Sequence, residues 1–141
     1  MDRSPRYRMM CEQARDIQAR WKPAYGDFFV HADGRIDCWI PATCSGRNLR
    51  RGFEIQTEGS LIRLIKHVWL PRQDQLIEMA QTPGQRFDST TQAFYRWTKT
   101  PYQRLPGYPN QIFTTMEQIW LAFVMEVKFH RKWTGTRWGA I

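Results

Sequence analysis

The stretch WLPRQDQLIEMA (69–80) decides how the rest of this 141-residue chain is interpreted. Two large apolar residues precede a proline, and a polar run leads into apolar residues at helical spacing. Pro71 suits the first position of a helix, where its missing N–H leaves no bond unmade, and Asp74 complements the helix dipole in the first turn. The apolar face comprises Leu76, Ile77, Met79 and Ala80, and Thr82-Pro83-Gly84 should end the helix. The stretch therefore predicts a strand that ends where a helix begins.

Before this junction the sequence predicts a single N-terminal helix. Ser4 and Pro5 suit its N-cap and its first position. One stripe at a period of 3.6 residues is apolar except for Gln18, and its apolar members are Tyr7, Met10, Cys11, Ala14, Ile17 and Trp21. Lys22-Pro23 should end this helix, because a residue before proline avoids the helical region.

A small antiparallel sheet should follow. Residues 28–31 and 35–40 are β-prone, and Asp33-Gly34 between them favours a type I′ hairpin turn. Pro41 should end the second strand, and residues 42–52 should form an arginine-containing loop. Residues 53–71 offer one or two more extended runs, although residues 61–68 fit a short helix equally well.

Two further helices are predicted after Gly84. Asp88 or Ser89 suits the N-cap of a short helix that reaches residue 99, and a proline-rich loop follows it. Thr114 and Glu117 match a capping box at the start of a helix that is apolar nearly all round. We therefore predict an α+β fold in a single domain, residues 1–141. Its parts are an N-terminal helix, an antiparallel sheet from 27 to about 68, and three helices, of which the C-terminal one is central and buried.

Bulk properties narrow the function classes. Lys and Arg number 21 against 13 Asp and Glu, and the net charge of +8 favours polyanionic partners. No apolar run approaches the ~20 residues of a membrane-spanning helix, so no membrane partner is expected. The N-terminus MDRSPRYRMMCEQ lacks the apolar core of a signal peptide. Three cysteines are an odd set that does not suit a secreted disulfide scaffold, which favours an intracellular protein with reduced thiols.

Neither metal binding nor catalysis has a convincing motif. Cys38 and Cys44 stand too far apart for a zinc knuckle, and the histidines show no paired spacing. Cys38 with His31 is the nearest approach to a nucleophile and base, but their flanks match no known motif. Of the possible carboxylate cluster Asp27, Asp33 and Asp37, Asp33 is better explained as a turn residue. We expect no enzyme activity, no cofactor and no metal.

Basic and aromatic residues give the best candidate site. Arginine mixed with aromatic residues suits stacking on bases together with phosphate contacts, and it equally suits a protein-binding hot spot. The candidates form three clusters along the sequence: Arg47, Arg50 and Arg51; Arg96, Trp97, Lys99, Tyr102 and Arg104; and Lys128, Arg131 and Lys132 at the C-terminal end of the last helix.

Three segments together resemble one protein family. WLPRQDQLIEMA and TTMEQIWLAFVMEVKFHRKWTGTRW, preceded by CEQARDIQARWKPAYGDFF with its W-x-P-x-x-G-D pattern, are similar in order to small proteins of uncharacterised activity encoded by phages and prophages of Gram-positive and related bacteria. The resemblance covers most of the chain and implies a context, the cytoplasm of a bacterial host cell, without catalytic residues to carry over. The family's tail is commonly more acidic than the KFHRKWTGTRWGAI found here.

Two functions follow as hypotheses. In the first, the chain is a non-enzymatic phage or prophage binding protein that acts through a host or phage protein partner. In the second, it is an accessory protein that binds DNA or RNA through its arginine and aromatic patches. The oligomeric state does not follow from the sequence.

Overall fold

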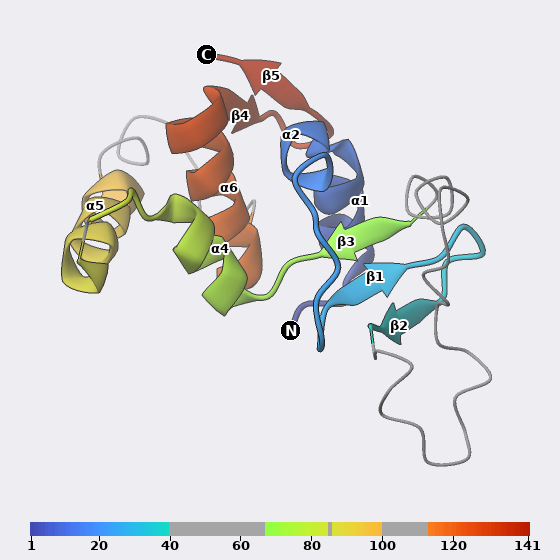
Figure 1. Ribbon diagram of the computed structural model, residues 1–141. Helices are drawn as coiled ribbons and strands as arrows, with labels where there is room; N and C mark the ends of the chain where they lie inside the picture. The colour runs from blue at the N-terminus through green and yellow to red at the C-terminus, as the bar shows by residue number, and fades with distance from the viewer. Residues whose placement is uncertain (40–66, 85, 100–112) are drawn as a thin grey trace. The chain divides into compact units, whose positions relative to one another are not determined.

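The computed structural model describes residues 1–39, 67–84, 86–99 and 113–141 (Figure 1). The chain divides into two units, one spanning Arg3–Pro71 and the other Met1–Asp2 with Arg72–Ile141. Helices accompany small antiparallel sheets, so the predicted α+β class is confirmed. Among the described residues, no helix combines the length and the apolar character needed to cross a membrane.

The unit Arg3–Pro71 begins with two helical segments where one helix was predicted. Helix α1 spans Pro5–Gln13, and the Ser4 hydroxyl accepts the Tyr7 N–H as the expected N-cap. The backbone leaves the helical region at Ala14 (ψ 60°), and α2 spans Arg15–Gln18. The Gln18 side chain lies back over this break and donates to the Cys11 carbonyl at 3.0 Å. The apolar stripe is nevertheless buried as far as Ile17.

Three short strands form the sheet of this unit in the order β2-β1-β3, all antiparallel (Figure 1). Strand β1 spans Phe28–Val30, β2 spans Ile36–Cys38 and β3 spans Val68–Leu70. The third strand thus lies just beyond the predicted sheet boundary, and residues 40–66, including Pro41 and the predicted arginine loop, lie outside the described residues.

The hairpin between β1 and β2 is present, but its predicted type I′ turn is wrong. That turn needs a positive φ at both central residues, and here Gly34 (φ 83°) has one whereas Asp33 does not. The Gly34 N–H donates to the His31 carbonyl, and the His31 N–H donates to the Arg35 carbonyl. This is a three-residue loop with glycine in the left-handed position. Asp33 accepts from Arg35 instead, and the Arg35 backbone N–H and side chain lower the pKa of Asp33.

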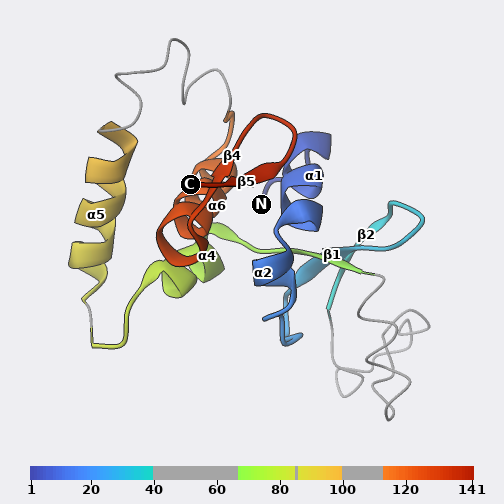
Figure 2. The same ribbon diagram turned by 90° about the horizontal axis from the view of Figure 1, so that it is seen from above.

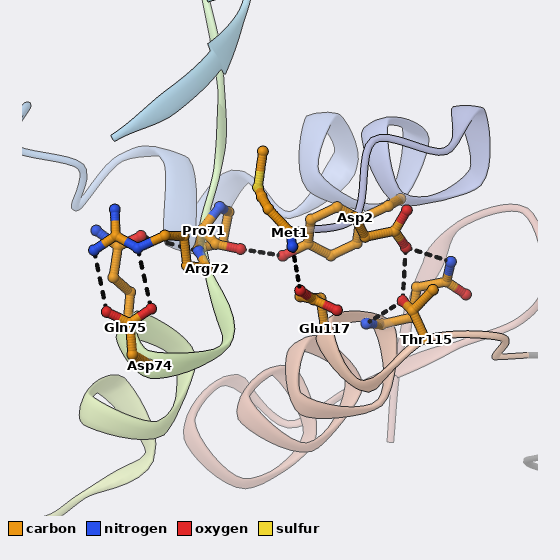
Figure 3. Close-up of polar contacts among 10 residues, drawn as sticks. Met1, Asp2, Pro71, Arg72, Asp74, Gln75, Thr115 and Glu117 are labelled. Atoms are coloured by element: carbon orange, nitrogen blue, oxygen red, sulfur yellow. Dashed lines mark hydrogen bonds and ion pairs between the residues drawn. The ribbon is translucent and has the colours of Figure 1, made fainter. Parts of the chain in front are cut away.

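The second unit starts at the junction that opened the sequence. Strand β3 ends at Leu70 and helix α4 spans Gln73–Ala80, so the predicted strand-to-helix junction is confirmed. Pro71, however, precedes the helix instead of occupying its first position. Arg72 is the N-cap, its backbone N–H donates to the Gln75 side chain at 2.9 Å, and its guanidinium pairs with Asp74 (Figure 3).

Helix α5 spans Phe87–Lys99 and begins two residues before the predicted start. Asp88 therefore lies in the first turn, where a carboxylate complements the helix dipole, and neither it nor Ser89 is the N-cap. The proline-rich segment 100–112 that follows lies outside the described residues.

Helix α6 spans Met116–Phe129 and is the centre of its unit, as predicted. Its N-cap is Thr115 instead of Thr114, and its third residue is Gln118 instead of Glu117. The Thr115 hydroxyl accepts the Gln118 N–H, while the Gln118 side chain accepts the Thr114 N–H. Asp2 adds a buried carboxylate that accepts from the Thr115 hydroxyl and the Gln118 amide, both at 2.7 Å (Figure 3).

The apolar middle of α6 is buried without interruption at residues 120–125. It packs chiefly against α4. A helix that is apolar on every side must be covered on every side, which explains why α6 is the core element here.

The end of α6 differs from the prediction. The helix stops at Phe129, and His130 adopts a left-handed conformation (φ 53°, ψ 43°) as its C-cap. The chain then forms a hairpin of β4, Arg131–Trp133, and β5, Trp138–Ala140 (Figure 2). Trp133 and Trp138 face each other across it with ring centroids 4.9 Å apart. Arg131 and Lys132 thus lie on a strand and not at the end of the helix.

Candidate interaction surface on helix α5

The predicted site residues do not all fall within the described part of the chain. Arg47, Arg50, Arg51, Tyr102 and Arg104 lie outside it. Those that the structure places are Arg96, Trp97 and Lys99 on α5, Lys128 on α6, and Arg131 and Lys132 on β4. Helix α5 therefore holds more of the described candidates than any other element.

One side of α5 is exposed along its whole length. Residues four apart lie above one another on a helix, and here Phe87, Thr91, Tyr95 and Lys99 are all exposed. We call these four residues the outer stripe. Phe87 is 59% exposed and Tyr95 is 58% exposed, which is unusual for two large aromatic residues on one helix. In both views α5 lies at the edge of its unit (Figures 1 and 2).

The C-terminal end of the outer stripe combines a cation with an aromatic ring. The Lys99 ammonium lies 4.3 Å from the centroid of the Tyr95 ring, a cation–π contact between residues four apart. Arg96 is exposed beside them. Lysine held over tyrosine presents a charge and an apolar surface together, a combination found both at protein hot spots and at nucleic-acid contacts.

Trp97, by contrast, lies mostly within an aromatic cluster that joins α5 to α6. Phe94 stacks on Trp120 with centroids 3.8 Å apart, and Trp97 meets Phe123 edge to face at 5.3 Å. Aromatic pairs of this kind stabilise by about 0.5–1.5 kcal/mol beyond their buried area. The cluster explains why Phe94 is buried while the outer stripe is not. Replacing Trp97 would therefore disturb packing as well as any surface that it forms.

The predicted C-terminal cluster is not a single patch. Lys128 is half-buried, and its ammonium donates to the carbonyl of Gln81 just beyond the end of α4, at 3.1 Å. Arg131 and Lys132 are successive residues of β4, so their side chains leave opposite faces of the strand. Lys128 instead shares a cleft of about 290 Å³ with Trp97.

The titratable and nucleophilic side chains considered in the sequence lie in the unit Arg3–Pro71. His31 contacts His67 with ring nitrogens 3.1 Å apart, and its other ring nitrogen lies 3.5 Å from the Asp37 carboxylate. Cys38 follows Asp37 on β2, so alternation turns its thiol to the face opposite His31. No cluster of three or more metal-ligating side chains occurs where the structure describes the chain. Asp27 is buried and accepts from Trp21 and Ala24, which is a structural role.

Sequence reasoning did not select Phe87 or Thr90. Phe87 follows the breaker Pro83-Gly84 and lies eight residues before Tyr95, a spacing that predicts a shared side of the helix once its start is known. Thr90 had no such signal, because a threonine in a polar stretch gives no indication of burial. No protein-family model, no curated protein and no solved structure matches this chain.

Proposed function

We propose that this chain is a non-enzymatic binding protein, encoded by a phage or prophage, that acts in the host cytoplasm through a host or phage protein partner. The phage context is supported by the motif resemblance alone. The contact surface is the outer stripe of α5 together with Arg96. The observation that carries this proposal is the exposure of Phe87 and Tyr95 on one helix that also bears Lys99 and Arg96.

Physical reasons favour this surface. Tyrosine and arginine are enriched among hot-spot residues, and an amphipathic helix can lie in the apolar groove of a partner through anchors spaced four residues apart. Exposed aromatic side chains of this size remain in contact with water unless a partner covers them. Because Phe87 and Tyr95 are little more than half exposed, burying both contributes on the order of 2–4 kcal/mol before the costs of association.

Site-specific photo-crosslinking tests the proposal. A photoreactive phenylalanine placed at position 95 should capture a defined protein when the chain is expressed in a bacterial host. The same residue at position 25 is the matched control, because Tyr25 is 69% exposed and lies in the other unit. The Phe87→Ala and Tyr95→Ala variants should each weaken binding of the captured protein by about tenfold or more, whereas Tyr25→Ala should not. Capture of the same protein from both positions, or unchanged binding by both variants, contradicts the proposal.

Nucleic-acid binding is the second candidate. It is favoured by the contact of Lys99 with Tyr95 next to Arg96, which suits a base stacked on the ring and a phosphate near the cations. Fluorescence anisotropy with single- and double-stranded DNA and RNA should then give an affinity that falls steeply with salt, with a log–log slope near −0.9 per phosphate contact on duplex DNA. Joint replacement of Arg47, Arg50 and Arg51 by alanine should flatten this slope if those residues take part. Absence of binding at low salt would remove this candidate.

A further inference from the structure

The cleft shared by Trp97 and Lys128 lies among the end of α4, α5 and α6, away from the outer stripe. Its volume of about 290 Å³ is close to the lower limit of small-molecule sites, roughly 300 Å³. A space of this size admits a ring with a short chain.

Most of the described lining is apolar. Trp97 and Phe123, which meet edge to face at 5.3 Å, contribute aromatic surface, and the partly exposed Val127 also lines the cleft. Ala80 and Ala93 have small side chains that leave the space unfilled. The body of an occupant is therefore apolar, with a shape suited to contact with aromatic rings.

The described lining has three polar side chains, Thr82, Thr90 and Lys128, and the last two give the cleft a specific chemistry. Thr90 is only 2% exposed, and its hydroxyl has no hydrogen-bond partner anywhere in the described part of the chain. Buried hydroxyls are nearly always hydrogen-bonded, so this hydroxyl is an unused donor in the wall of the cleft. Lys128 uses one of its three donors on the Gln81 carbonyl and keeps the others. None of the described lining residues is acidic, so no lining carboxylate neutralises this ammonium.

We propose that this cleft binds a monocarboxylate with a ring-sized apolar body. Lys128 and Thr90 donate hydrogen bonds to the carboxylate, and Trp97 and Phe123 contact the apolar body. This chemistry is shared by a free small acid and by the C-terminal residue of a peptide. The proposal does not depend on partner binding by the outer stripe, because it uses none of those residues.

Titration of the whole chain with hydrocinnamate tests the proposal. NMR signals of the backbone amide and indole N–H groups report the binding. Hydrocinnamamide is the matched probe, since it keeps the ring and loses the charge. Hydrocinnamate should shift the signals of α5, α6 and the Trp97 indole in a saturable manner, and the amide should bind about tenfold more weakly or worse.

Substitutions of two lining residues test whether hydrocinnamate binds in this cleft. Lys128→Met keeps the aliphatic stem and should weaken hydrocinnamate binding by about tenfold, and Thr90→Val, which keeps the side-chain shape, should weaken it by severalfold. Thr90→Val removes an unpaired hydroxyl, so this variant should fold. It therefore keeps the test decisive even if Lys128→Met fails to fold. Lys22→Met is the control, because it removes the same charge from an exposed site in the other unit.

A further titration distinguishes a free small acid from the C-terminal residue of a peptide as the ligand. N-acetylphenylalanine mimics a peptide C-terminus, and tighter binding than hydrocinnamate assigns the site to a chain end, whereas weaker binding assigns it to a free acid. Absence of saturable shifts with either acid overturns the proposal. Equal affinity for acid and amide overturns it as well, and so does an equal loss with Lys22→Met and Lys128→Met.

Discussion

Gln18 shows how one polar side chain can complete a sheet. Its amide accepts the Trp69 N–H at 2.8 Å and donates to the Trp69 carbonyl at 2.9 Å, so it occupies the open edge of β3 as a neighbouring strand would. Exposed strand edges favour unwanted pairing with other chains, and proteins commonly cover them. The position was recognisable in the sequence as the polar exception on an apolar stripe, but its partner, 51 residues away, was not.

Gln18→Glu should destabilise the protein by about 1–3 kcal/mol. Glutamate keeps the acceptor for the Trp69 N–H, but its second oxygen then faces two carbonyls where the amide donated. Gln18→Ala removes all three hydrogen bonds of the side chain and should cost a similar amount. Urea unfolding measures the change, with the exposed Gln92→Glu as a control. An unaltered unfolding midpoint for Gln18→Glu would show that the amide does not hold this edge.

Asp27 gives the W-x-P-x-x-G-D pattern a structural meaning. Its carboxylate accepts both the Trp21 indole N–H and the Ala24 backbone N–H at 2.9 Å, and thereby closes the turn that leads from α2 to β1. Trp21 then stacks on Trp69 with an interplanar angle of 4°. A pattern that resembles a family signature is thus explained here by folding.

Asp27→Ala should cost about 2–4 kcal/mol, because it leaves two donors unpaired in a largely buried site. Trp21→Phe keeps an aromatic ring but loses the N–H and part of the indole surface, so it should cost about 1–2 kcal/mol. Chemical denaturation of the two variants checks this order. Equal costs would mean that ring packing, and not the carboxylate, dominates the turn.

At the scale of elements, the sequence predicted which helices exist better than where they end. The apolar pattern of α6 is strong enough to identify the core helix, because burial on every side leaves no alternative. The N-cap of α6 lies one residue after the predicted one, because Thr114 and Thr115 are both suitable N-cap residues. The buried Asp2 carboxylate, which accepts from the Thr115 hydroxyl, favours Thr115. The β4–β5 hairpin was missed because its strands are only three residues long and its start depends on the backbone of His130.

His130 provides a direct test of that backbone. A non-glycine residue in the left-handed region is strained by contact of its Cβ with the backbone, and this position is a common site of glycine at helix ends. His130→Gly should therefore stabilise the protein by roughly 0.5–1 kcal/mol. His130→Ala is the matched comparison because it keeps the Cβ. If thermal unfolding places the alanine variant level with the glycine variant, the left-handed C-cap is wrong.

The pair of Arg72 and Asp74 at the start of α4 should make the stability of the protein depend on pH. Side-chain hydrogen bonds from Arg72 lower the pKa of Asp74 below its ordinary value of 3.8. A carboxylate with a lowered folded-state pKa adds stability above its unfolded pKa, and this stability is lost as pH falls through the folded value. The contribution should be below about 1 kcal/mol, because the Asp74 side chain is 69% exposed and screened by solvent.

Asp74→Asn should therefore lower stability slightly at neutral pH and make no difference in acid, below both pKa values. Denaturant unfolding of both proteins along a pH series measures this. A gap between them that persists or widens in strong acid would contradict the assigned sign. At this scale, the acidic first turn was predicted from the sequence, but Arg72 as its partner was not, because the predicted helix began at Pro71.

For the whole molecule, the pattern of apolar and turn residues predicted the fold class, and the composition left the function open. Residues 3–71 carry 12 Lys and Arg against 7 Asp and Glu, a net +5 of the total +8, so each unit is basic and neither is a dedicated cationic module. Charge is visible in a sequence, whereas the cleft with Thr90 and Lys128 requires α5 and α6 to be packed together. The candidate site was predictable only as a helix with basic and aromatic residues.

The division into two units yields a prediction about cooperativity. Gln18 and its hydrogen-bond partners lie within Arg3–Pro71, whereas Asp2 accepts from Thr115 and Gln118 in the other unit. Local contacts set the free energy of local opening. Gln18→Ala should therefore speed amide hydrogen exchange in β1 and β3 and leave α4 and α6 nearly unchanged, and Asp2→Ala should do the reverse. If either variant accelerates exchange equally in all these elements, the chain opens as one cooperative body, and the single domain predicted from its length is also a single folding unit.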